Sequence, residues 1–170
     1  MTSEESGACP EALLEGRFNG PVEFADLIRQ ALAVAAAQGW HEIILCDPDF
    51  GDWPLGERAV AQALHDWARR GRKLTMLARK YDAVLRRHAR FVTWRRSWSH
   101  LVECCGSAAS PVGSLPSALW SPGWVVERLD IERSTGLAGF DAVRRIALKE
   151  RLNERLQNSS PAFPATVLGL

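Results

Sequence analysis

The chain has 170 residues, of which 46% are hydrophobic and 24% are charged, and its net charge at neutral pH is +1. This length suits one domain with a single hydrophobic core, and no apolar run in the sequence approaches the roughly 20 residues that cross a bilayer. The first residues, MTSEESGACPE, are acidic where a secretory signal is basic and then apolar. We therefore expect a cytoplasmic globular protein with no membrane partner.

The N-terminal third of the chain predicts an arm, a helix and a strand. Residues 1–18 are expected to form a flexible arm, with a helical turn within residues 10–18 as one interpretation. A helix is predicted from Pro21, which suits the first turn, to Gln38, before Gly39 ends it. The run that follows, residues 42–47, is apolar and too short for a helix, as is typical of a buried strand.

The loop after this strand is the default ligand site, because ligands of open α/β sheets bind beyond the carboxyl ends of strands. Its candidate ligand-binding residues are Asp47, Asp49, Asp52 and Trp53. Three carboxylates in six residues could hold a divalent cation, but DPDFGD does not match an EF-hand loop and the same residues can cap a helix. We therefore expect no metal.

The rest of the chain alternates helices and strands. Helices are predicted at residues 56–70, 81–88 and 139–156, and strands at residues 73–78, 91–94, 99–105, 119–120 and 124–129. A strand, a helix and a second strand in that order predict a parallel crossover. The expected fold class is α/β: a three-layer sandwich of residues 19–157 around a mixed sheet of about five to seven strands with a largely parallel core.

The last residues, 158–170, contain two prolines but end in apolar side chains. We expect this tail to pack on its own domain or on a partner subunit, which makes a homodimer a candidate. The four cysteines show no CxxC spacing, and Cys104 and Cys105 are adjacent, so that they face opposite sides of a strand. The sequence therefore predicts neither a zinc site nor a redox motif, and no cofactor.

Positive charge is concentrated in residues 69–96, which contain eleven Lys or Arg against one acid, Asp82. This segment carries 11 − 1 = +10, so the remainder of the chain sums to −9. The asymmetry can mark an anionic partner, and the interleaved aromatic residues Tyr81, Phe91, Trp94 and Trp98 are typical of nucleic-acid binders. The alternative is a solvated surface that acids elsewhere in the fold compensate.

The order of these elements resembles one half of the phospholipase D superfamily fold, with HEIILCDPDF at the first strand, WARRGRKLTMLA from the end of the second helix through the second strand, and a His in SHLVECC. The resemblance implies that His100 is the nucleophile of an HxK motif. Val102 stands where the family has its Lys, however, and GSAASPVGS lacks the downstream Asp. Without that Lys, phosphate would have to be held by Arg95 or Arg96, and a structural role for His100 is the alternative.

Three functions compete on this basis. The preferred one is a non-catalytic binding or interaction domain related to the phospholipase D fold, with an unknown ligand at the strand ends, for which a phosphate-containing molecule is one candidate. The second is a diverged phosphodiesterase or nuclease that uses His100. The third is a nucleic-acid-binding protein that uses the basic segment 69–96.

Overall fold

The computed structural model describes residues 12–107 and 115–164. The five helices of this part are α1 (Pro21–Gln38), α2 (Arg58–Ala68), α3 (Asp82–Arg87), α4 (Ala89–Ser97) and α5 (Ala142–Gln157). Its strands are β1 (Gly16–Asn19), β2 (Glu42–Cys46), β3 (Lys73–Ala78), β4 (Val102–Ser107), β5 (Ser117–Trp120), β6 (Val125–Asp130), β7 (Thr135–Gly139) and β8 (Ser159–Pro161).

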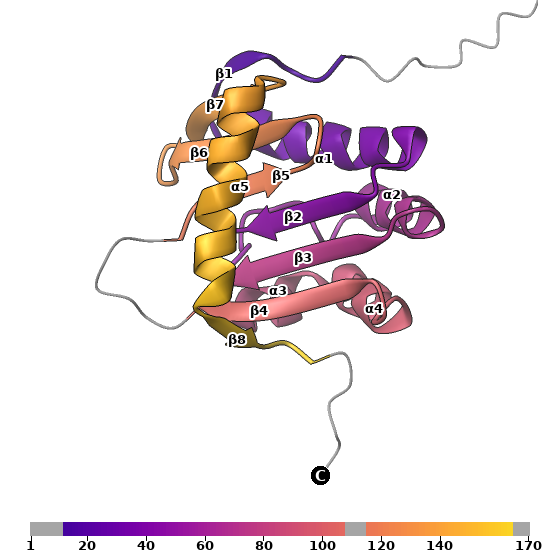
Figure 1. Ribbon diagram of the computed structural model, residues 1–170. Coiled ribbons are helices and arrows are strands. Elements are labelled where there is room, and N and C mark those ends of the chain that lie inside the picture. The colour runs from indigo at the N-terminus through magenta and orange to yellow at the C-terminus, as the bar shows by residue number, and fades with distance from the viewer. Residues whose placement is uncertain (1–11, 108–114, 165–170) are drawn as a thin grey trace, which may run out of the picture.

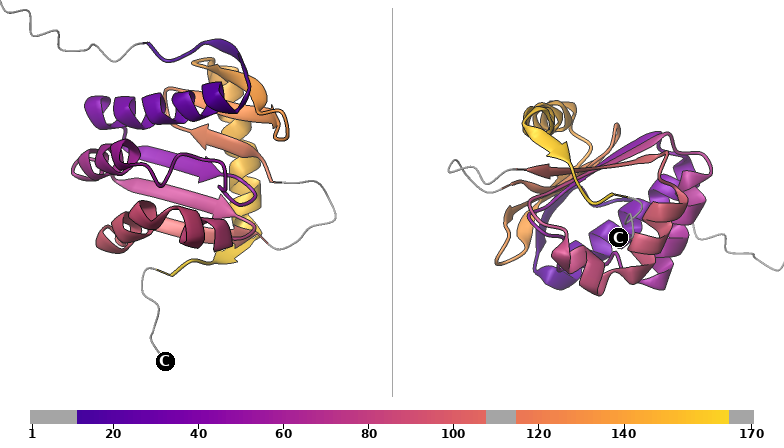
Figure 2. Two further views of the ribbon diagram at one scale, coloured as in Figure 1. Left: turned by 180° about the vertical axis from the view of Figure 1, so that it is seen from behind. Right: turned by 90° about the horizontal axis from the view of Figure 1, so that it is seen from below.

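The strands form one open, mixed sheet with the order β1-β7-β6-β5-β2-β3-β4-β8. Only β2, β3 and β4 run parallel, and the strands on either side pair antiparallel. Helices α1 to α4 cover one face of the sheet and α5 crosses the other (Figures 1 and 2). The expected mixed α/β architecture with a parallel core is confirmed, and the sheet is larger than predicted.

Local sequence explains the central elements. Helix α1 begins with Pro21 at its first position and ends at Gly39, whose φ of 66° is the left-handed conformation that glycine adopts without strain. The predicted bounds of α1 and of β3 are those of the structure. Strand β2 is buried over Ile43–Cys46, because helices cover both of its faces.

The core has two parts, one on each side of the sheet. The larger lies under α1, α2 and α4, and the smaller lies under α5 around Leu148 and Leu152. Cys104 belongs to the first and Cys105 to the second, so the two side chains lie on opposite faces, as expected. No helix in residues 12–107 and 115–164 is long and apolar enough to span a membrane.

One predicted strand is wrong: residues 91–94 lie in helix α4. Phe91 and Trp94 are three positions apart and both buried, so packing on the sheet overrides the strand preference of the sequence Phe-Val-Thr-Trp. Three strands were not predicted. Residues 16–19 form β1 rather than a helical turn, residues 135–139 form β7, and β8 lies just after the last helix.

The described end of the tail packs on its own chain. Strand β8 pairs with β4, and the ring of Phe163 stacks on Tyr81 with ring centroids 5.1 Å apart. Residues 165–170, residues 1–11 and residues 108–114 of the expected surface loop lie outside the described part. Of the flexible arm expected at 1–18, residues 16–18 instead belong to β1, whereas the flexibility of residues 1–11 and the docking of the whole tail stay predictions.

Candidate functional site

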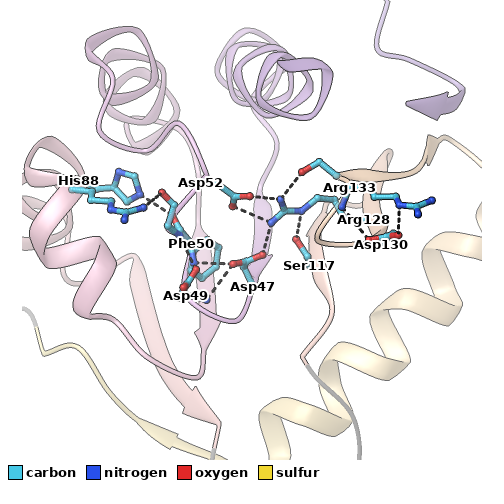
Figure 3. Close-up of polar contacts among 12 residues, drawn as sticks. Asp47, Asp49, Phe50, Asp52, His88, Ser117, Arg128, Asp130 and Arg133 are labelled. Atoms are coloured by element: carbon cyan, nitrogen blue, oxygen red, sulfur yellow. Dashed lines mark hydrogen bonds and ion pairs between the residues drawn. The ribbon is translucent and has the colours of Figure 1, made fainter. Parts of the chain in front are cut away.

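The acidic loop after β2 is folded around the carboxylate of Asp47 (Figure 3). Asp47 Oδ2 accepts hydrogen bonds from the backbone N–H groups of Asp49, at 3.1 Å, and Phe50, at 2.8 Å. Asp49 Oδ1 accepts one from the N–H of Gly51, at 2.9 Å. These bonds hold Phe50 at φ 58°, a value that is uncommon for a residue other than glycine.

A buried arginine from a distant strand completes this loop. Arg128 of β6 donates from Nη2 to Asp47 Oδ1, at 2.8 Å, and from Nη1 to Asp52 Oδ2, at 2.6 Å. Its Nε donates to Ser117 Oγ of β5, at 2.8 Å, and the side chain is fully buried. The guanidinium also lies 4.1 Å from the centre of the Phe24 ring, so that helix α1 covers it with a cation–π contact.

The electrostatic balance at Arg128 favours its charged form. Burial alone lowers the pKa of this guanidinium, but hydrogen bonds to Asp52 and the charges of Asp47 and Asp52 outweigh burial and raise it. Both oxygens of Asp47 and both of Asp52 are thereby engaged. Among the described residues, no three His, Cys, Asp or Glu side chains are grouped as metal ligands. We infer that the acidic loop is a structural junction between β2 and the β5–β6 hairpin.

Arg128 was not among the predicted site residues, although the sequence carried a signal for it. In WVVERLD, Val126 and Arg128 are two positions apart on a strand and so face the same side. Val126 belongs to the core under α1 and is fully buried, which places the arginine inward too. An inward-facing arginine needs carboxylate partners, so the sequence indicated a buried ion pair at Arg128 without indicating that its partners are Asp47 and Asp52.

The other predicted residue of this loop, Trp53, is a core residue. Its ring lies 5.4 Å from Phe24 and 4.8 Å from Phe50, edge-on to both, and 2% of the residue is exposed. His88, which was not predicted, is also buried beside the loop, with Nε2 2.7 Å from the carbonyl oxygen of Phe50. Trp53 therefore stabilises the loop from the core.

The basic segment divides into two groups at opposite ends of the parallel strands. One group, Arg79, Lys80, Arg86, Arg87 and Arg90, lies beside the acidic loop; we call it the basic surface. Arg87 and Arg90 donate to the carbonyl oxygens of Gly51 and Gly56, and all five side chains are exposed. The second group includes Arg72 and Lys73 and lies at the other end, where β3 begins.

His100 lies beside the second group of basic residues and not beside the acidic loop. It is exposed two residues before β4, and it lines a cavity with Arg72, Lys73 and Arg95. Arg96 lines the adjacent cavity instead, beside Tyr81 and Phe163. The structure therefore brings His100 together with Arg95, as a phosphodiesterase would need, and separates both from Asp47, Asp49, Asp52 and Trp53. Catalysis by His100 stays a prediction, which loss of bis-p-nitrophenyl phosphate hydrolysis in His100→Ala would support.

Comparison with known proteins identifies a similarity to a solved structure. No protein-family model matches the chain, and no curated protein matches it. Among solved structures, it is similar to TrmBL2, an archaeal chromatin protein described as having a novel mode of DNA binding, with a TM-score of 0.64 and 16% sequence identity. The likeness covers 89% of this chain and 55% of TrmBL2, so it extends over about half of that protein.

The likeness corrects the expected family. The chain was expected to be half of a phospholipase D-like fold, but its structural neighbour is TrmBL2 and no family model supports the phospholipase D assignment. The resemblance rested on an order of helices and strands that many α/β sheets share, and its specific motif was already missing at Val102. The comparison establishes the fold of this chain.

Proposed function

We propose that this chain binds nucleic acid through the basic surface formed by Arg79, Lys80, Arg86, Arg87 and Arg90. The observation that carries the proposal is that this charge is not neutralised within the chain. Across the described residues, Lys73 alone of the eleven basic residues in 69–96 lies within 4 Å of a carboxylate. Outside the segment, Arg29, Arg128, Arg133, Lys149 and Arg151 all form such pairs.

The acids near the basic surface leave its charge available. Asp49 and Asp82 are exposed in the same region, and neither forms an ion pair with a described residue. Five cations against Asp49 and Asp82, with the adjacent Asp47, Asp52 and Arg128 adding −2 + 1 = −1, give a local charge of 5 − 2 − 1 = +2. An exposed surface of this kind attracts the phosphates of a nucleic acid by displacing their counterions. The DNA-binding description of TrmBL2 supports the same class of partner.

The aromatic residues of the segment favour duplex over single-stranded DNA. Tyr81, Phe91 and Trp94 are buried, and the Tyr81 hydroxyl donates to the carbonyl oxygens of Met76 and Cys105. Buried rings cannot stack on bases, and stacking is the main attraction of sequence-independent single-strand binders. The fourth aromatic residue, Trp98, is half-buried, so three of the four rings of the segment are unavailable for stacking and most of the attraction falls to contacts with phosphates.

Neutralising part of the basic surface is expected to weaken DNA binding and to reduce its dependence on salt. In the triple variant Arg79→Gln/Lys80→Gln/Arg86→Gln, three exposed side chains that make no described hydrogen bond are changed, so folding is preserved. We expect affinity for a labelled 30-base-pair duplex to fall at least about tenfold at 50 mM salt, and the slope of log K against log[salt] to become shallower by about 3. Fluorescence anisotropy between 50 and 200 mM KCl measures both.

The matched control changes the same amount of charge elsewhere. Arg17→Gln/Arg58→Gln/Arg144→Gln also removes three positive charges, from β1, α2 and α5. If this control weakens binding as much as the first triple variant, the attraction depends on net charge and the proposed surface is wrong. Tighter binding to a single strand of the same length would contradict the preference for a duplex.

A further inference from the structure

Arg95, on helix α4, is buried without a counter-charge among the described residues. Only 7% of the residue is exposed, and its Nε and Nη1 have no hydrogen-bond partner in the part of the chain that the structure describes. Nη2 makes a long bond, 3.4 Å, to the carbonyl oxygen of Phe163. A guanidinium keeps its charge in a protein, and a buried charge is unfavourable unless it is paired. This site therefore favours an anion.

The residues around Arg95 do not supply that anion. The nearest acid in its cavity, Glu103, pairs with Lys73 at 3.2 Å. The thiol of Cys104 lies beside Arg95, but burial raises the pKa of this thiol to about 11 and keeps it neutral. The buried Arg128 differs in this respect, because it forms ion pairs with two aspartates. Arg95 lacks an equivalent among the described residues.

The cavity beside Arg95 is basic and large enough for a small molecule. Its volume is about 610 Å³, within the range of small-molecule sites. Arg72, Lys73 and His100 line it together with the hydroxyl group of Ser99. Pro161, Ala162 and Pro164, from β8 and the segment after it, form an apolar wall. The cavity thus combines cations and one hydroxyl donor with apolar residues that suit carbon groups.

We propose that this cavity binds a phosphate monoester, with Arg95 holding the phosphate, Arg72 and Lys73 at the rim, and the 161–164 wall against the organic group. A phosphate dianion suits a planar guanidinium, because two of its oxygens can accept parallel hydrogen bonds. The cavity lies at the beginning of β3 and β4, whereas the basic surface lies beyond the end of β3. The proposal is therefore independent of nucleic-acid binding at the basic surface.

The test compares the wild type with Arg95→Met, in which an apolar side chain of similar length replaces the buried cation. Without ligand, we expect the variant to melt at or above the wild-type temperature, because a buried uncompensated charge is lost. Phenyl phosphate is expected to raise the melting temperature of the wild type and to bind at least about tenfold more weakly to Arg95→Met by calorimetry. Benzyl alcohol, which lacks the phosphate, is expected to have no effect on either.

A second variant keeps the proposal testable if Arg95→Met does not fold. Arg72→Gln/Lys73→Gln changes two exposed residues at the rim, and we expect it to weaken phenyl phosphate binding about two- to fivefold per residue. Absence of saturable binding by phenyl phosphate, inorganic phosphate and DNA ends, or binding that neither variant weakens, would overturn the proposal.

A phosphorylated DNA end and a free phosphomonoester present the same group. Duplexes with 5′-phosphate and 5′-hydroxyl ends distinguish the two sources. A preference for the 5′-phosphate that Arg95→Met removes supports the cavity with a DNA end as its ligand. Binding of phenyl phosphate without such a preference supports it with a free small molecule. In that case, duplex affinity is unchanged in Arg95→Met but still falls in Arg79→Gln/Lys80→Gln/Arg86→Gln.

Discussion

Replacing Arg128 by methionine is expected to lower the free energy of unfolding by about 3–5 kcal/mol, because Asp47 is then left buried without a counter-charge. The side chains of Arg128 and Asp47 are 0% and 2% exposed, so water cannot replace the lost partner. The variant also removes the donors to Ser117 and Asp52. Urea unfolding of the wild type and the variant, with comparable m-values, measures the difference.

Two further variants separate the buried pair from the exposed one. Asp52→Asn changes a side chain that is 51% exposed, and we expect it to cost at most about 1 kcal/mol. Adding Asp47→Asn to Arg128→Met removes the uncompensated carboxylate and is expected to recover part of the lost stability. If Arg128→Met costs no more than Asp52→Asn, the junction is not held by its buried ion pair.

The junction shows how far local sequence could predict this loop, whose ligand-binding role stays a prediction. A strand that ends in Asp, Pro, Asp and Gly is a local pattern, and the structure has the loop where it was predicted. The partner of Asp47, however, lies 81 residues away in the chain. Nothing local indicates such a contact, so acids that a buried arginine engages were interpreted as acids available to a ligand.

Elsewhere in the fold too, some elements follow from local sequence and others from contacts between distant residues. Helix α1 and strand β3 were predicted to the residue, since their caps and apolar runs are local. Strands β1, β7 and β8 have three to five residues each, and they are strands only because a neighbour in the sheet supplies hydrogen bonds. Helix α4 shows the reverse case, where packing against the sheet overrides a local strand pattern.

The two ends of the parallel strands therefore have different roles. Beyond their carboxyl ends, Arg128 is paired with Asp47 and Asp52 inside the fold, and the five exposed cations of the basic surface form no ion pair with a described residue. At their amino ends, Arg95 is buried beside an open cavity and lacks a carboxylate partner among the described residues. A small-molecule site combines a cavity with a few convergent polar groups, and the cavity beside Arg95 has both, so we expect the amino ends to be the small-molecule site, against the usual location in α/β sheets.

Gly136→Ala is expected to destabilise the fold by about 3 kcal/mol, the upper part of the range for overpacking. Gly136 of β7 is directly opposite Arg128 of β6 in the sheet. A β-carbon at Gly136 would overlap the carbonyl oxygen of Glu127 and lie 2.9 Å from Cα of Arg128. Backbone atoms cannot rotate away as a side chain can, so β7 must separate from β6 at the residue that carries the buried ion pair.

Gly123→Ala is the matched control, because a β-carbon there meets no atom within 4 Å. It lies in the turn between β5 and β6, and we expect its stability to stay within about 0.5 kcal/mol of the wild type. Equal effects of the two substitutions in urea unfolding would contradict the proposed overlap. Because Gly136→Ala displaces Arg128, combining it with Arg128→Met is expected to cost less than the sum of the two single changes. Additive costs would show that the close packing of β7 on β6 at Gly136 and the ion pair of Arg128 with β2 stabilise the sheet independently.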